Sequence, residues 1–406
     1  MNWKKILLLL GLLAITVGVG YFIYYLLFGA PAGPTVVLPP EANVNVPVQP
    51  LPPSAVGGPV VPTAPAPGAE LPPGVSAVAN GGPTLVTPVT NTPATGASVS
   101  ANGSVSYYNR IDGKFYRRLP NGQIVPMSEK VFFDASGVTF DPAGGKAIIE
   151  YPDGSNILYD FNNSRQVTLP AHWEDFRFDP SGDQIAAKSI GTDPSNRYLI
   201  VSNPDGSGAK AIQALGENAD KVQVNWSPNN QIIATATTGE FQGLDSREIF
   251  FVGQNHENFK SLVVEGFDFR PEWSPSGEQL LYSAASSTTD YKPELWLVDA
   301  NGDNIGRNRR TLNVNTWADK CTFAGDSTVY CAVPSSMPRG AGLQPAVADD
   351  IPDNIYKIDL VTGLQTMVAE PEGGHTVGKL MLAPDGKTLY FTDKTSQILN
   401  EIKISE

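Results

Sequence analysis

A short hairpin motif recurs along most of the chain and limits what the chain can fold into. In its clearest copy, Trp273 precedes the turn Ser274-Pro275-Ser276-Gly277, and the apolar run Gln279–Tyr282 follows. Proline presets φ at the first corner of such a turn, and glycine adopts the left-handed conformation that closes it. A single hairpin is marginal because it cannot bury its own apolar side chains. Repetition of the motif therefore predicts hairpins packed beside one another.

Seven copies of this turn can be aligned, and each is followed by an apolar strand. The step between aligned positions runs from 38 residues (Pro142 to Pro180) to 60 residues (Ala324 to Pro384). Repeat periods of this size are typical of propeller blades. The aligned turns are Ala101-Asn102-Gly103, Asp141-Pro142-Ala143-Gly144, Asp179-Pro180-Ser181-Gly182, Ser227-Pro228-Asn229-Asn230, Ser274-Pro275-Ser276-Gly277, Phe323-Ala324-Gly325-Asp326 and Ala383-Pro384-Asp385-Gly386.

Each unit then adds two further strands with turns of their own. In the clearest units these turns are Asp112-Gly113, Asn121-Gly122 and Asp153-Gly154, and such dipeptides favour tight hairpins. The pattern predicts an all-β β-propeller of four-stranded antiparallel sheets over residues 97–406. Seven blades are favoured, and six remain the alternative if residues 97–128 only complete the last blade. The last unit lacks a fourth strand after Ile398–Ile404, and an upstream strand near Thr84–Thr90 would close the ring.

Two copies of the motif carry a family resemblance. The runs from Ser274 to Tyr282 and from Ala383 to Phe391 resemble the S-P-D-G-K-x-L-x-F core of TolB-type propeller repeats. The resemblance covers about residues 97–406 and implies the propeller fold. It implies little about activity, because this repeat family includes scaffolds, periplasmic binding proteins and the propeller caps of peptidases. Two copies depart from the pattern, since Asn102-Gly103 lacks the proline and Ala324 replaces it.

The N-terminus predicts a membrane anchor. Lys4 and Lys5 precede an uncharged run over residues 6–28, which is long enough to cross a bilayer core of about 30 Å. The positive-inside bias places residues 1–5 in the cytoplasm and the rest of the chain outside it, at the cell surface or in the periplasm. A cleaved signal peptide is the alternative.

Residues 29–96 are rich in proline, valine, alanine and glycine, and they carry only Glu41 and Glu70 as charged residues. No hydrophobic period persists in this segment, so it is expected to be a disordered, semi-extended linker without a core.

Composition excludes some functions. The net charge of −13 and the pI near 4.7 argue against a nucleic-acid-binding surface, which needs a basic patch. No nucleophile elbow is present, and the three histidines are isolated, so neither a catalytic site, a metal site nor a cofactor is expected. Asp349, Asp350 and Asp353 could hold calcium, although a solvated acidic loop is the preferred interpretation.

Candidate binding residues lie in the long connections, which a four-stranded meander places on one face of the ring. Trp173-Glu174-Asp175 and Trp317-Ala318-Asp319 repeat one pattern before two aligned turns. They predict an acidic binding site edged by aromatic rings for a cationic or sugar-like group. The structural alternative is that each tryptophan packs against the neighbouring blade and each aspartate accepts hydrogen bonds from turn amides. The full candidate set is Trp173, Asp175, Asp220, Tyr291, Trp317, Asp319, Arg339 and His375.

Cys321 and Cys331 flank one hairpin turn, and a disulfide and two buried thiols are both compatible with the sequence. The sequence as a whole predicts an anchored envelope module that binds or scaffolds a protein or glycan partner without catalysis. An exported carbohydrate-binding or carbohydrate-active enzyme that uses the propeller funnel is the alternative.

Overall fold

The computed structural model describes residues 3, 17–19, 72–240, 242–243 and 245–406. The chain divides into two compact units, residues 1–57 and 58–406. In the first unit the described residues, Trp3 and 17–19, are helical. No helix within the described part of the chain is long and apolar enough to cross a membrane. Apart from these four residues, the predicted stub, the predicted span 6–28 and the linker up to residue 71 lie outside the described residues.

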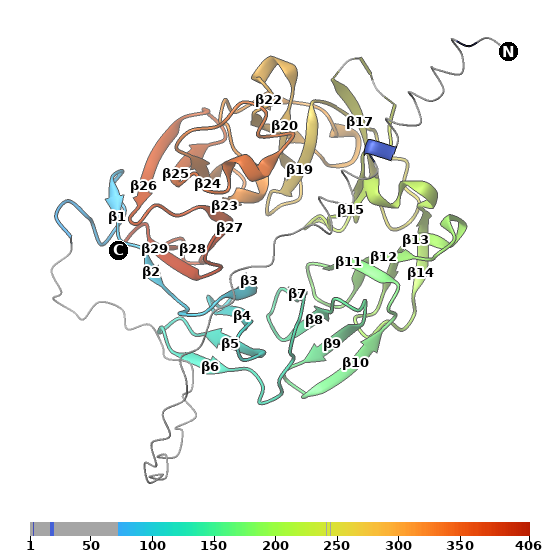
Figure 1. The fold of residues 1–406 in the computed structure, drawn as a ribbon, viewed down its shortest axis with the longest axis horizontal. Coiled ribbons are helices and arrows are strands. Elements are labelled where there is room, and N and C mark those ends of the chain that lie inside the picture. The colour runs from blue at the N-terminus through green and yellow to red at the C-terminus, as the bar shows by residue number, and fades with distance from the viewer. Residues whose placement is uncertain (1–2, 4–16, 20–71, 241, 244) are drawn as a thin grey trace, which may run out of the picture. The chain divides into compact units, whose positions relative to one another are not determined.

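The second unit is a ring of seven antiparallel sheets, here called blades I to VII in chain order (Figure 1). Each blade has one innermost strand, and several of these strands contact the innermost strand of the next blade. The innermost strands are β3 (Ala94–Val99), β7 (Gly137–Phe140), β11 (Trp173–Phe178), β15 (Val222–Val224), β19 (Phe267–Trp273), β23 (Cys321–Phe323) and β27 (Val377–Leu382).

The second strands follow the repeated turns. They are β4 (Val105–Asn109), β8 (Lys146–Glu150), β12 (Ile185–Ile190), β16 (Ala234–Ala236), β20 (Gln279–Ala285), β24 (Thr328–Pro334) and β28 (Thr388–Asp393). The third strands are β5 (Lys114–Arg118), β9 (Asn156–Asp160), β13 (Arg197–Ser202), β17 (Ser246–Val252), β21 (Pro293–Asp299), β25 (Asp353–Asp359) and β29 (Leu399–Lys403).

The outer strands complete the sheets. They are β6 (Ile124–Pro126), β10 (Arg165–Leu169), β14 (Lys210–Ala214), β18 (Leu262–Glu265), β22 (Arg310–Thr311), β26 (Gln365–Pro371) and, for blade VII, β2 (Thr87–Pro88). Short 3-10 helices occur in the connections: η1 (Pro194–Asn196), η2 (Gly216–Lys221), η3 (Ser287–Thr289), η4 (Gly302–Asn304), η5 (Ala318–Lys320) and η6 (Pro345–Ala348).

The repeated turn forms as its residues predict. Gly277 has a φ of 70°, and its amide donates to the Ser274 carbonyl oxygen at 2.8 Å. The Ser274 hydroxyl accepts from the Gln279 amide at 3.1 Å. Leu280 and Tyr282 are fully buried between blades IV and V, and Leu281 is fully buried between blades V and VI, so the second strand is covered on both faces. This confirms the propeller, and the sheet made by residues 94–126 confirms seven blades rather than six.

The ring closes with residues from upstream of blade I, as predicted. In β2, Thr87 and Pro88 pair antiparallel with Glu401 and Asn400 of β29. A further two-residue strand, β1 (Pro83–Thr84), runs parallel to β26 and gives blade VI a fifth strand. The predicted boundary at residues 96/97 is therefore too late, because ordered strands begin within the proline-rich segment. Proline fits there because these are edge strands, where a missing N–H costs no ladder hydrogen bond.

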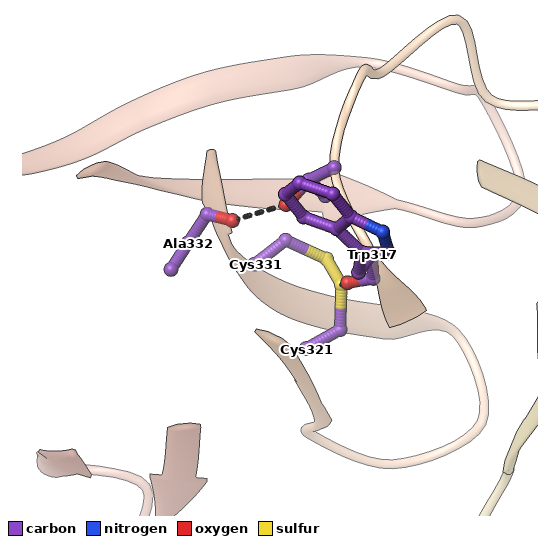
Figure 2. Close-up of a disulfide and its surroundings, with 5 residues drawn as sticks. Trp317, Cys321, Cys331 and Ala332 are labelled. Atoms are coloured by element: carbon purple, nitrogen blue, oxygen red, sulfur yellow. Dashed lines mark hydrogen bonds between the residues drawn. A yellow bond between two sulfur atoms is a disulfide. The ribbon is translucent and has the colours of Figure 1, made fainter. Parts of the chain in front are cut away.

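The two cysteines are joined. Cys321 and Cys331 are opposite one another on β23 and β24, with Cα atoms 4.1 Å apart, and their sulfur atoms form a disulfide (Figure 2). Trp317 lies beside the bridge in the same view. The disulfide is buried in the core between blades V and VI.

Candidate functional site

The long connections lie on one side of the ring, here called the upper face, and they are joined to one another. The Ser287 amide of blade V donates to Asp245 of blade IV at 3.1 Å. Residues 335–352 of blade VI, here called the cap segment, continue the chain of contacts: the amides of Gly340 and Gly342 donate to the carbonyl oxygens of Asp290 and Tyr291 at 2.9 and 2.8 Å. The upper face over blades IV to VI is therefore one connected surface.

Gly342 is required for this close approach. A Cβ atom at that position would lie 2.1 Å from the Cβ atom of Ala285 in blade V. Arg339 and Asp290 add a surface ion pair at 3.4 Å between the same two segments. The cap segment also reaches blade VII, where Asp349 pairs with Lys394. Contacts to blades V and VII hold the cap segment in place.

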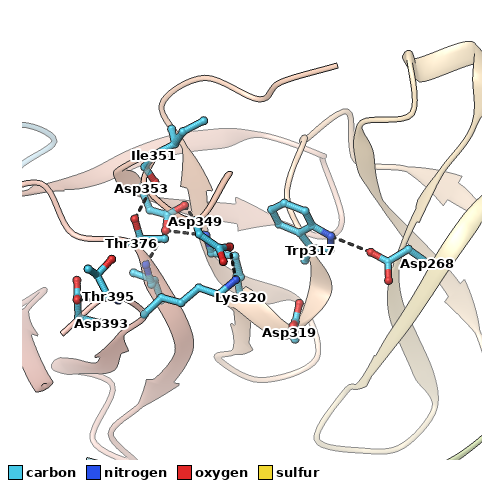
Figure 3. A network of polar contacts seen from close by, with 12 residues as sticks. Asp268, Trp317, Asp319, Lys320, Asp349, Ile351, Asp353, Thr376, Asp393 and Thr395 are labelled. Atoms are coloured by element: carbon cyan, nitrogen blue, oxygen red, sulfur yellow. Dashed lines mark hydrogen bonds and ion pairs between the residues drawn. The ribbon is translucent and has the colours of Figure 1, made fainter. Parts of the chain in front are cut away.

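Trp317 supports the cap segment from below. Its side chain is 4% exposed and packs against Ala341, Ala348 and other apolar residues of the cap. Its indole N–H donates to an oxygen of Asp268 on β19 at 3.0 Å (Figure 3). A buried N–H needs such a partner, because leaving it without one costs about 1–3 kcal/mol. The ring is thus part of the framework and offers no open face for a sugar.

Asp319 belongs to the same group. Arg270 donates to Asp319 at 2.9 Å and to Asp268 at 3.0 Å, and its guanidinium carbon lies 5.4 Å from the centre of the Trp317 ring. Burial opposes the charge on Arg270, but the hydrogen bonds and charges of Asp268 and Asp319 raise its pKa further above its ordinary value. The cluster joins blade V to blade VI.

A buried ion pair lies next to this cluster. Lys320 donates to both carboxylate oxygens of Asp353 at 2.7 Å, and one of these oxygens also accepts from the Val377 amide of blade VII at 2.7 Å (Figure 3). Both side chains are buried. Removing one partner from such a pair costs about 3–5 kcal/mol, because the other charge remains in the interior.

A cavity of about 100 Å³ opens between these groups. Its walls come from blades V, VI and VII and include Arg270, Trp317, Asp319, Lys320, Asp349 and Lys394. The volume admits a few water molecules or one small chemical group, which is too little for a drug-sized ligand.

The matching pair in blade III has a different environment. Trp173 is 7% exposed and packs within the core between blades II and III. Asp175 has a φ of 57° at a bulge in β11 and accepts from the Val224 amide of blade IV at 3.0 Å. Both side chains serve contacts between blades. The structure therefore does not bring Trp173 and Asp175 together with Trp317 and Asp319.

The remaining predicted residues are spread over the upper face. Asp220 is exposed in η2. The ring of Tyr291 lies 6.5 Å from that of Phe267. His375 bonds to Asp393 at 3.0 Å through Nδ1, and its ring packs edge-on against Phe391. Of the predicted residues, Trp317 and Asp319 line a common cavity.

Asp268, Arg270 and Lys320 were not singled out from the sequence, and Asp353 was considered only as a possible calcium ligand. One signal was available: Asp-Phe-Arg occurs twice, as Asp175-Phe176-Arg177 and Asp268-Phe269-Arg270, each at the bulge of an inner strand. Both aspartates have positive φ, and both accept a hydrogen bond from the next blade.

No group of three or more His, Cys, Asp or Glu side chains in the described ranges is placed to hold a metal ion. Asp353 on β25 is bound to Lys320, and Asp349 in the cap segment is bound to Lys394, so a different lysine holds each of these two aspartates.

Several solved structures share this fold. An oligogalacturonate lyase in complex with manganese has a TM-score of 0.57 and 13% identity, covering 79% of this chain and 93% of that one. The oligogalacturonate lyase from Vibrio parahaemolyticus has a TM-score of 0.54 and 10% identity, covering 79% of this chain and 91% of that one. Hydrazine synthase from Kuenenia stuttgartiensis has a TM-score of 0.51 and 13% identity, covering 77% of this chain and 96% of that one. At these identities the likeness concerns the fold alone. No protein-family model and no curated protein matches the sequence.

Proposed function

We propose that the propeller is a binding module of the cell envelope, anchored to a membrane by its N-terminal segment, and that it docks a protein partner on its upper face. The observation that carries this proposal is the connected upper face over blades IV to VII. Hydrogen bonds between neighbouring loops already hold this surface in one conformation. A preorganised surface loses less conformational entropy when it binds a partner.

The exposed chemistry of the cap segment suits a protein partner. Leu343 and Val347 are 55% and 44% exposed, and the ion pairs Arg339–Asp290 and Lys394–Asp349 lie within the same linked surface. An apolar centre with a charged surround is the usual anatomy of a protein interface.

The setting in the envelope is supported by three features. The uncharged run 6–28 after Lys4 and Lys5 fits an anchor with an exported domain. The Cys321–Cys331 disulfide fits an oxidising compartment. The seven blades, five of which carry a proline in the aligned turn, fit a TolB-type propeller, a repeat family that includes periplasmic binding proteins.

A carbohydrate-active enzyme would need the Trp-x-Asp residues to face a ligand. Instead, Trp317 is bound to Asp268, Asp319 to Arg270, and Asp175 to the Val224 amide. These contacts support a structural role for the pattern, and protein binding is therefore the function that we propose.

Site-specific photo-crosslinking in the full chain tests the docking face. Benzoylphenylalanine at Leu343 or Val347 should give a discrete protein adduct in membranes of the source cells. The matched controls are Val361 and Leu364, which are 77% and 66% exposed in the β25–β26 turn on the opposite side of the ring. Leu343→Asp should lower the adduct at position 347 by about tenfold, a loss of about 1.4 kcal/mol.

Equal adducts from both sides of the ring, or adducts to glycan without protein, would contradict a protein-docking upper face. Val361→Asp should leave the adduct at position 347 unchanged.

A further inference from the structure

A polar cavity of about 250 Å³ lies in the central channel, below the cavity at Trp317. It is lined from four directions: Ser98 on β3 of blade I, Glu272 on β19 of blade V, Thr322 on β23 of blade VI, and Lys379 and Met381 on β27 of blade VII. Asp319 lines both this cavity and the one above it.

Glu272 and Lys379 face this space without a direct partner. Within the described residues, neither side chain makes a hydrogen bond, and the two do not form an ion pair with each other or with any neighbour. Each is exposed to the channel between buried apolar neighbours on its own strand. Blades I and VI present the neutral side chains of Ser98 and Thr322 to the same cavity. The blade fold therefore does not require a charged residue such as Glu272 or Lys379 on an inner strand.

The channel walls surround the two charged groups, although both side chains are exposed to the space inside the channel. Enclosure raises the pKa of Glu272 to about 7; the Lys379 and Arg177 charges oppose this rise, and Asp319 adds to it. Enclosure also lowers the pKa of Lys379 from its ordinary value, and Glu272 opposes that shift. Neither charge is paired within the described part of the protein, and a ligand with complementary groups would pair both at once.

We propose that this cavity binds a small carboxylate whose other end donates hydrogen bonds, as in an amino acid or a hydroxy acid. The carboxylate lies on the Lys379 ammonium, and the ammonium or hydroxyl end lies on the Glu272 carboxylate. The Lys379 ammonium and the Glu272 carboxylate line one cavity without forming an ion pair, and a ligand of a few carbon atoms would bridge them. This site is separate from the protein-docking surface and does not rest on it.

A matched set of probes tests the assignment: γ-aminobutyrate, γ-hydroxybutyrate and butyrate, which share a four-carbon carboxylate chain and differ in the group at the end that faces Glu272. Titration calorimetry on the full chain should show binding of the first two and at least about tenfold weaker binding of butyrate. Lys379→Met should weaken both binders by at least about tenfold, because it removes the partner of the carboxylate. Lys357→Met, on the exposed side of β25, is the control and should change neither affinity.

Glu272→Gln separates the two ligand classes. It should weaken γ-aminobutyrate by about tenfold and leave γ-hydroxybutyrate nearly unchanged, because the amide oxygen still accepts from a hydroxyl. Affinity for γ-aminobutyrate should fall as pH drops through about 7, where Glu272 takes up a proton beside Lys379, Asp319 and Arg177. Circular dichroism and thermal unfolding confirm that the variants are folded.

The proposal is overturned if none of the probes binds, or if folded Lys379→Met binds both as tightly as the natural chain does. Equal affinity for butyrate would also contradict it, because Glu272 would then play no part in recognition.

Discussion

At the scale of the residue, the contacts between blades on the upper face are largely polar. Asp175 and Asp268 occupy the same bulge position in two inner strands, and each accepts a hydrogen bond from the following blade. Asp353 of blade VI likewise accepts a hydrogen bond from the Val377 amide of blade VII. A side-chain carboxylate can satisfy a backbone or indole N–H where no strand neighbour is available, so these residues keep the loop ends of the blades aligned.

Asp393 in blade VII carries a pH-dependent part of the stability. Burial opposes its ionisation, but hydrogen bonds from His375 and from the Ser396 amide and hydroxyl lower its pKa from 3.8 to about 2. A lowered native pKa stabilises the fold above the unfolded value, here by about 2 kcal/mol, and that contribution disappears as pH falls from about 4 to about 2.

Asp393→Asn should therefore lower the free energy of unfolding by about 2 kcal/mol at neutral pH, and the difference from the natural chain should shrink below about pH 4. Urea unfolding at a series of pH values measures it. Asp385→Asn, in an exposed turn of the same blade, serves as the control. A difference that stays constant with pH would show that the ionised form of Asp393 is not what stabilises the native state.

At the scale of the element, the hairpin of β23 and β24 differs from its six counterparts. Its turn lacks the proline of the other late copies, and a disulfide joins Cys321 to Cys331 across the two strands. Trp317, which supports the cap segment, lies directly before this hairpin and packs beside the bridge (Figure 2). The covalent link therefore secures the hairpin that stands closest to the proposed docking surface.

Reduction should destabilise the chain by up to about 3 kcal/mol, the loop-closure value for a bridge with a sequence separation of 10. Thermal unfolding with and without reductant measures this. The double variant Cys321→Ala, Cys331→Ala should match the reduced chain and should not respond to reductant. Mass spectrometry gives the direct check: the natural chain should gain the mass of two hydrogens on reduction, and an unchanged mass would disprove the bridge.

At the scale of the whole molecule, the ring depends on two very short strands. Thr87 and Pro88 supply the outer strand of blade VII, and the Val89 amide extends the pairing to Leu399 at 2.8 Å. Val89 is buried with residues of blades VII and I, so the closing segment also fills the core at the junction of the two ends of the ring. Closure removes the free edge that blade VII would otherwise expose.

Deleting residues 83–88 from the full chain should open this edge. Amide hydrogen exchange in β29 should become faster by at least about tenfold. The strand loses its pairing with Thr87 and Pro88 of β2, and the packing of Val89 is disturbed. An equal deletion at residues 58–63, outside the described residues, is the control. Unchanged exchange over residues 399–403 would mean that β29 does not depend on the upstream strand.

The sequence alone determined the fold, because each hairpin is coded locally. Pro275 and Gly277 set one turn within four residues, and the buried run after them sets the next strand, so seven copies predict seven blades. It also indicated where the long connections lie and that an upstream segment closes the ring.

Only the tertiary structure decided what the conspicuous residues contact. Trp317 and Asp268 lie 49 residues apart in sequence, and Lys320 and Asp353 lie 33 apart, because each pair joins two blades or the two ends of a long connection. Glu272 and Lys379 reach one cavity from blades V and VII, and nothing in either strand alone indicates it. Turn and strand preferences act over a few residues, whereas contacts across the ring depend on how neighbouring blades pack. For that reason the repeats revealed the scaffold, and the channel and the upper face had to be read from the folded molecule.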